Sequence, residues 1–300
     1  MITHAARSHH GSRSPGRGPV PAAPFMVAAA VALAGLAVTY MFFIERTAGQ
    51  YLDESALVEA AVARRIIGVQ VSQVLDSLPA TSVVIAVIVV LFVTLARRRW
   101  KAAGIALAAM AAANLTTQVI KFALPDRPDV GVTTLALNSL PSGHSTIAAS
   151  AAAAVFLVVS PRWRPVTAFA GGSYAVVAGV ATLINQWHRP SDVMAAFFIV
   201  ALWTSVAGLV ILRTGPQWNV WLGASQHWAS SRWWAAACAV LALVAGIFTA
   251  LILRSVAADP SASTTSFFLA GVGQIVMVGY GLAMAGILLL TIPVRRRSPR

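Results

Sequence analysis

Long apolar runs recur along the whole chain and restrict the folds that it can adopt. Eight runs reach the length needed to cross a bilayer, at residues 26–44, 80–96, 102–124, 144–160, 166–186, 191–212, 233–253 and 267–294. About 20 apolar residues cross a hydrocarbon core of about 30 Å, and their backbone groups must be hydrogen-bonded internally as helices. With 58% hydrophobic and 10% charged residues, a soluble protein would lack a polar surface. The sequence therefore predicts an all-α, polytopic membrane helical bundle with about eight transmembrane helices.

The positions of the charges predict how the chain is oriented in the membrane. A net charge of +13 would suit nucleic acid, but most of the 22 lysines and arginines fall in the tails and loops that share one side. Cytoplasmic loops carry such an excess of basic residues. All nine acidic residues fall on the other side. We therefore expect a multi-pass protein of the plasma (inner) membrane with both termini cytoplasmic and no nucleic-acid partner.

The pattern along the chain divides it into three expected parts. Residues 1–25 are rich in Arg, Ser, Gly and Pro, which indicates a disordered, basic cytoplasmic tail. Residues 26–213 are expected to form a catalytic core and 214–300 a C-terminal extension of two helices. Residues 45–79 mix charges with apolar residues at helical spacing, which predicts interfacial helices lying flat, with a break at Gly68. Glycines in the last span favour close helix packing or a homodimer: Gly271, Gly273, Gly279, Gly281 and Gly286.

Two polar stretches stand out, Pro141–His144 and His188–Asp192, and each opens an apolar run on the acidic side. Ser142 has the right residue type and position to cap the following helix, and Gly143 leaves the backbone amides accessible. A helix N-terminus of this kind favours a phosphate. Pro190 suits a first helical turn, which places His188 and Asp192, four residues apart, on one face.

These residue types together predict phosphate chemistry without a metal or other cofactor. Asp192 can accept a proton from one nitrogen of His188, which frees the other nitrogen to attack phosphorus. His144 could then protonate the leaving alkoxide. Lys121 and Arg127 lie at the same boundary and can hold the nonbridging oxygens and stabilise the transition state. We expect phosphomonoester hydrolysis through a phosphohistidine.

The same residues resemble the three-part signature of the type 2 phosphatidic acid phosphatase superfamily, over about residues 121–192. In that family the parts are Lys, six residues, Arg-Pro; then Pro-Ser-Gly-His; then Ser-Arg, five residues, His, three residues, Asp. The second part is complete here, and His188 and Asp192 match the end of the third. The resemblance implies a core of six membrane spans with catalytic loops on the outer side, as fits residues 26–212.

The chain departs from this signature in two places. Only five residues separate Lys121 from Arg127, one fewer than in the family, and Ala181-Thr182 stands where the family has Ser-Arg. A phosphate-binding arginine is therefore missing. Arg189 is the nearby cation that could replace it, and we hypothesise that it does.

Several alternatives remain open from the sequence. His144, His188 and Asp192 could be metal ligands, although the cations beside them would repel a dication. The chain could instead be a transporter, or a weakly active or inactive protein that binds lipid phosphate. The expected partners are membrane lipids and a lipid phosphate substrate. Phosphatidate, phosphatidylglycerol phosphate and a polyprenyl phosphate or diphosphate all suit such a site, and an isoprenoid carrier is the specific expectation.

Overall fold

The computed structural model describes residues 20–133, 138–215, 220–221, 227–258, 264–291 and 295–296. Helices account for most of these residues. In chain order they are α1 (Ala23–Phe43), α2 (Thr47–Arg97), α3 (Trp100–Ala123), α4 (Gly143–Val158), α5 (Arg164–Ile184), α6 (Pro190–Thr214), the 3-10 helix η2 (Trp228–Ser230), α7 (Trp233–Ala258) and α8 (Ser266–Thr291). Two short strands, β1 (Val220–Trp221) and β2 (Arg295–Arg296), pair in parallel.

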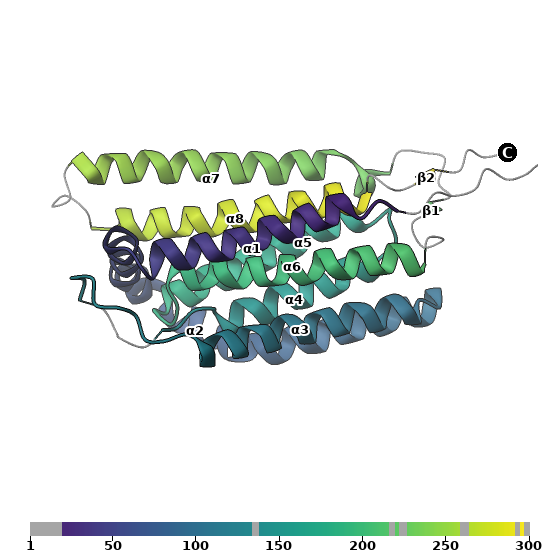
Figure 1. Cartoon of the computed structure of the whole chain (residues 1–300), viewed down its shortest axis with the longest axis horizontal. Coiled ribbons are helices and arrows are strands. Elements are labelled where there is room, and N and C mark those ends of the chain that lie inside the picture. The colour runs from purple at the N-terminus through teal and green to yellow at the C-terminus, as the bar shows by residue number, and fades with distance from the viewer. Residues whose placement is uncertain are drawn as a thin grey trace, which may run out of the picture.

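The helices confirm the expected all-α membrane bundle. Seven segments of the described chain are long and apolar enough to span a bilayer, and they coincide with seven of the eight expected spans to within a few residues. The remaining expected span, residues 144–160, corresponds to α4, which has 16 residues and is short for a membrane span. It lies in the middle of the bundle and packs on α2, α3, α5 and α6, as its run of alanines and serines indicated (Figure 1).

The first part of α2 crosses one end of the bundle. Figure 1 shows it end-on in dark purple and blue at the left, whereas the later part of α2 runs along the bundle beside α3. The crossing direction agrees with the expectation that residues 45–79 lie flat, and their position at the membrane interface stays a prediction. The expected break at Gly68 is wrong, because the helix is continuous from Thr47 to Arg97. Gly68 instead lies close to the Arg64 side chain and to Asn185 Oδ1 at the end of α5.

The C-terminal helices pack unequally on the rest of the bundle. Helix α8 contacts α2, α5 and α6, whereas α7 lies outermost and contacts mainly α8 (Figure 1). Three of the α8 glycines make close contacts inside the chain: Gly271 faces Pro190, Gly273 faces Thr249 and Gly279 faces Val176. Of the two readings of the glycine pattern, close packing within the chain is the one that these contacts support.

Candidate active site

A tight turn between α5 and α6 presents His188. The backbone N–H groups of Trp187 and His188 both donate to the carbonyl of Thr182, at 3.0 and 3.4 Å. Gln186 makes the reversal possible with a left-handed backbone, φ 59°. Its side chain accepts from Arg64 and donates to the Leu57 carbonyl, both in α2. The first part of α2 therefore holds the turn that carries His188.

Asp192 lies one turn into α6 and orients His188, as the four-residue spacing predicted. His188 Nδ1 is 3.2 Å from Asp192 Oδ2, so Nε2 is left as the nitrogen that can attack an electrophile. The same carboxylate oxygen accepts the Ser139 hydroxyl at 2.6 Å and the Arg189 backbone N–H at 3.0 Å. With these donors around it, Asp192 is fixed and buried.

The start of α4 faces this pair. The Ser142 hydroxyl accepts from the Ser145 backbone N–H at 3.3 Å, which confirms the expected N-cap. The Ser142 N–H donates to the Asp192 carbonyl at 2.9 Å, so the beginnings of α4 and α6 are joined directly. A Cβ on Gly143 would lie 4.0 Å from Lys121 Nζ. The N-terminus of α4 and the Lys121 ammonium group therefore lie next to each other, and their combined positive charge suits an anion.

The two histidines lie across this place from each other. The rings of His144 and His188 are 6.4 Å apart between centroids, and Trp187 packs on His144 at 5.2 Å. An attacking nitrogen needs phosphorus within about 3.5 Å. A general acid must be within about 3 Å of the leaving oxygen. The two rings are close enough to act on the same phosphoryl group from two sides.

Behind this gap lies a buried layer of charges. Arg127 Nη2 is 3.3 Å from Asp53 Oδ2 and 3.9 Å from Asp192 Oδ1, and all three side chains are fully covered. Asp53 also accepts the Ser191 N–H at 3.0 Å and the Ser191 hydroxyl at 2.5 Å. Arg127 Nε and Nη1 find no hydrogen-bond partner among the described residues. The Nε and Nη1 groups of Arg127 could therefore donate hydrogen bonds to an anion. Because the side chain is fully covered, an anion can reach them only if the residues that cover Arg127 move.

The two carboxylates of this layer compete for one guanidinium. Burial and the nearby charge of Asp192 raise the pKa of Asp53 to about 6, and Arg127 and Ser191 oppose the shift. Of the two carboxylates, Asp53 is therefore the one that more readily takes up a proton as the pH falls. The link between α2 and Arg127 therefore weakens on the acid side.

Arg189 is held by α2 as well. Its Nε donates to Glu54 Oε2 at 2.8 Å and its Nη1 to the Ser139 hydroxyl at 3.1 Å. Thr182, at the position where the resembled family has arginine, is fully buried and its hydroxyl donates to the Gly179 carbonyl at 2.7 Å. An arriving phosphate would have to compete with Glu54 for Arg189.

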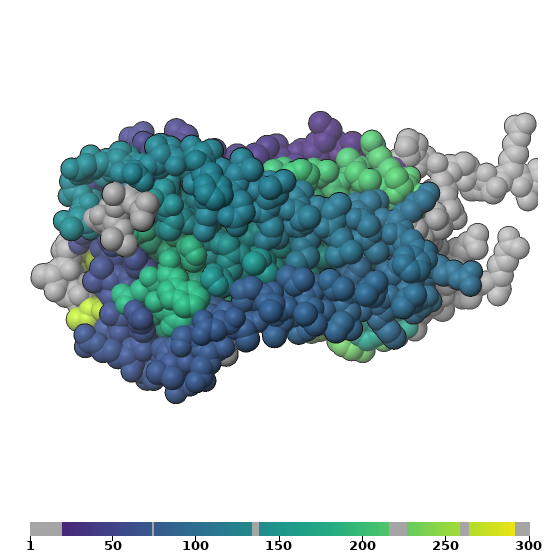
Figure 2. Space-filling view, turned by 90° about the horizontal axis from the view of Figure 1, so that it is seen from below, coloured from purple at the N-terminus to yellow at the C-terminus, as the bar shows by residue number. Residues whose placement is uncertain are grey.

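The groups divide into an accessible front and a covered back. The accessible front of the site consists of four partly exposed side chains, those of Lys121, His144, Trp187 and His188. In Figure 2 the green region around the α5–α6 turn reaches the surface between the dark blue first part of α2 and the teal end of α3. No group of three His, Cys, Asp or Glu side chains in the described residues could hold a metal ion. The expectation of metal-free chemistry stays a prediction.

The fold and this site define a polytopic membrane protein with a histidine–aspartate pair beside a helix N-terminus and a lysine. The family model of the PAP2 superfamily matches residues 102–216, which contain α3 to α6 and both polar stretches. This match agrees with the resemblance noted in the sequence. No curated protein and no solved structure matches the chain.

The structure brings together the eight residues expected at the site but gives them different surroundings. His144, His188, Lys121 and the Ser142-Gly143 helix start face one gap, whereas Arg127 and Arg189 are engaged by carboxylates of α2. Sequence reasoning missed four residues that shape the site: Asp53, Glu54, Ser139 and Trp187. Asp53 and Glu54 were placed on the correct side as acids, but their partners lie more than 70 residues away in the chain, which no local spacing reveals.

Proposed function

We propose that the chain is an integral membrane phosphatase that hydrolyses lipid phosphates on the extracytoplasmic side through a phosphohistidine intermediate. The observation that carries the proposal is the His188–Asp192 pair, 3.2 Å apart, facing His144 and the start of α4. The match to the PAP2 superfamily supports a phosphatase, and the seven candidate spans support a membrane substrate.

The proposed reaction has two steps in which atoms and charge balance. His188 Nε2 attacks phosphorus, the bond from phosphorus to the ester oxygen breaks, and His144 gives its proton to the leaving alkoxide. Water then attacks phosphorus, the bond from phosphorus to His188 Nε2 breaks, His144 takes the proton from that water, and inorganic phosphate leaves. Lys121, the amides at the start of α4 and the donors of Arg127 would carry the charge of the nonbridging oxygens. No metal or other cofactor is required.

The proposed substrate class follows from where the site lies. His188 and His144 are at the ends of apolar helices, so a phosphate attached to a membrane-embedded chain could reach them without leaving the bilayer surface. Phosphatidate, phosphatidylglycerol phosphate and polyprenyl phosphates or diphosphates all meet this condition. We propose a broad lipid phosphate phosphatase, with an isoprenoid carrier as the specific substrate.

A panel assay tests this function. The full chain is purified in detergent and phosphate release is measured for each of these lipids, with His188→Ala as the blank and His144→Ala and Asp192→Asn beside it. We expect His188→Ala to release no phosphate above background, and His144→Ala to be slowed about 10²- to 10⁴-fold, as for loss of a general acid. Equal release by wild type and His188→Ala on every lipid would refute the proposal.

A second candidate, a weakly active or inactive protein that binds lipid phosphate, is favoured by one observation. Both arginines of the site are already engaged by Asp53 and Glu54. A site with two occupied cations would bind phosphate through Lys121 and the α4 terminus and turn it over slowly. Binding of a radiolabelled lipid phosphate that survives without hydrolysis in wild type would select this candidate.

A further inference from the structure

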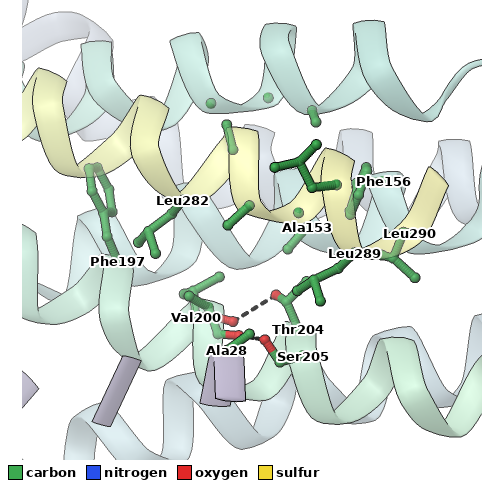
Figure 3. Close-up of a pocket in the computed structure, with 18 of the residues that line it drawn as sticks. Ala28, Ala153, Phe156, Phe197, Val200, Thr204, Ser205, Leu282, Leu289 and Leu290 are labelled. Atoms are coloured by element: carbon green, nitrogen blue, oxygen red, sulfur yellow. Dashed lines mark hydrogen bonds between the residues drawn. The ribbon is translucent and has the colours of Figure 1, made fainter. Parts of the chain in front are cut away.

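A large apolar cavity lies in the half of the bundle away from the candidate active site. Its volume is about 580 Å³, and its walls come from α1, α4, α5, α6 and α8. Figure 3 shows Phe156, Phe197, Leu282 and Leu289 around it, with α8 above and α6 below. The first turn of α1 and the last turn of α8 close its far end, through Phe25 and Leu290.

The cavity is separate from the gap between the rings of His144 and His188. Its wall on α4 begins at Ala149, five residues after His144, and its wall on α6 begins at Phe197, five residues after Asp192. An α-helix rises about 1.5 Å and turns about 100° per residue. Each cavity residue therefore lies about 8 Å further along its helix than the corresponding site residue, on a face rotated by about 140° about the helix axis. The catalytic residues and the cavity thus use different faces of the same two helices.

The walls offer a ligand almost nothing but hydrocarbon. The hydroxyl groups on α6 are used within the helix: Thr204 donates to the Val200 carbonyl at 2.7 Å and Ser205 to the Ala201 carbonyl at 2.8 Å, the dashed lines of Figure 3. The residues that line the cavity carry no charge. Cavities with such walls stay dry and take up apolar molecules.

The cavity also reaches the outer surface of the bundle. Three of its lining residues are themselves exposed there, Val27 and Val31 on α1 at 61% and 59% and Leu288 on α8 at 43%. Helix α1 packs mainly on α6 and has few contacts with α8, so the seam between α1 and α8 is the side opening. Both helices are candidate membrane spans, so what lies outside this opening is the interior of the bilayer.

We propose that this cavity binds one hydrocarbon chain of a bilayer lipid, inserted between α1 and α8, at a site separate from that of the substrate. A dry cavity of about 150 Å³ accepts benzene, and by the same ratio this one holds on the order of 20 carbons, the size of one lipid chain. Lipid chains are the apolar molecules present at this depth. The proposal does not rest on the proposed phosphatase function.

Photo-crosslinking tests the proposal on the full chain. The protein is reconstituted in liposomes of phosphatidylcholine and phosphatidylglycerol that contain a phosphatidylcholine with a diazirine halfway along one acyl chain, irradiated, and mapped by mass spectrometry. We expect adducts on wall residues such as Phe156 and Leu282. The cavity-filling variant Ala28→Phe should lose these adducts at least tenfold, and Ala201→Phe, which fills the cavity from the neighbouring helix α6, should do the same.

The matched control is Ala30→Phe, which adds the same ring to the same helix at an exposed position outside the cavity. It should keep the adducts. Adducts confined to outward-facing residues in wild type, or equal labelling of the walls in Ala28→Phe and Ala30→Phe, would overturn the proposal. Hydrolysis rates add a further check: if Ala28→Phe lost only long-chain substrates and kept short-chain ones, the cavity would hold the substrate tail and the separate site would be wrong.

Discussion

His188 is oriented by residues that the chain brings from three distant segments. Asp192 forms a hydrogen bond with the His188 ring. Asp192 in turn accepts hydrogen bonds from the Ser139 hydroxyl and the Arg189 backbone N–H. Gln186, in the same turn as His188, donates to a backbone carbonyl of α2. Asp53 and Arg127 close the back of the same cluster. Since each group is held by at least one other, the loss of any one of them affects the imidazole indirectly as well as the charge at its own position.

Substitutions in the Glu54–Arg189 ion pair can show whether Arg189 binds the phosphate of the substrate or only anchors α2. If Arg189 replaces the arginine missing at Thr182, Arg189→Ala should raise KM about 10- to 100-fold, as for loss of a hydrogen bond to a charged group. Glu54→Gln, which removes the competitor of phosphate, should leave KM unchanged or lower it. Steady-state kinetics on a lipid phosphate measure both. If Glu54→Gln raised KM as much as Arg189→Ala, with equal losses of thermal stability, the pair would only anchor α2.

The sequence predicted the front of this cluster better than its back. Pro-Ser-Gly-His and the His188–Asp192 spacing are local patterns, and caps and shared helix faces follow from local rules. The partners of Arg127 and Arg189 depend on α2 folding across the end of the bundle, and amphipathic spacing does not specify which carboxylate meets which arginine. Arg189 was expected to point at phosphate because Glu54 could not be placed beside it.

At the scale of elements, α2 and α8 determine how the core is closed. The first part of α2 covers the starts of α4 and α6, and α8 fits against α5 and α6 through glycines. The break expected at Gly68 does not occur, although glycine has a low helix propensity, and hydrogen bonds of Arg64 and of the Leu57 carbonyl tie this part of α2 to the turn after α5. Membrane spans were predicted within a few residues, because long apolar runs carry the strongest signal in such a sequence.

Two glycines of α8 provide a matched test of this packing. A Cβ at Gly279 would collide with Val176 and lie 3.3 Å from Phe197, whereas a Cβ at Gly281 meets nothing within 4 Å. Gly279→Ala should therefore destabilise the protein by about 1 to 3 kcal/mol. Gly281→Ala should leave stability unchanged or raise it by up to about 1 kcal/mol, since alanine favours the helix. Thermal unfolding in one detergent compares them, and similar losses for both would contradict the packing.

For the whole molecule, orientation in the membrane follows from charge. The apolar runs of the sequence place most of the basic residues in loops and tails on one side and the acidic residues on the side of the candidate site. The catalytic gap would then open outside the cell and the apolar cavity would lie in the cytoplasmic half of the bilayer. Sequence alone predicted this orientation, while the cavity depends on how five helices pack and could not be foreseen from their separate patterns.

Single cysteines test the orientation. Cys238 is the one cysteine of the chain and is buried, so Cys238→Ala gives a clean background. Thr264→Cys, before α8, and Thr214→Cys, at the end of α6, then place exposed thiols at opposite ends. A membrane-impermeant maleimide added to intact cells should label Thr264→Cys at once and Thr214→Cys only after permeabilisation. The reverse pattern would place the site inside the cell.

The most direct test of the mechanism is to trap the covalent intermediate. Wild-type protein is mixed with a lipid phosphate carrying ³²P, quenched in base during turnover, digested and mapped by mass spectrometry, with His188→Ala and His144→Ala run in parallel. We predict a base-stable, acid-labile phosphoryl group on His188, absent from His188→Ala and present in His144→Ala. Continued hydrolysis by wild type without a label on His188, or a label on another residue, would contradict the account.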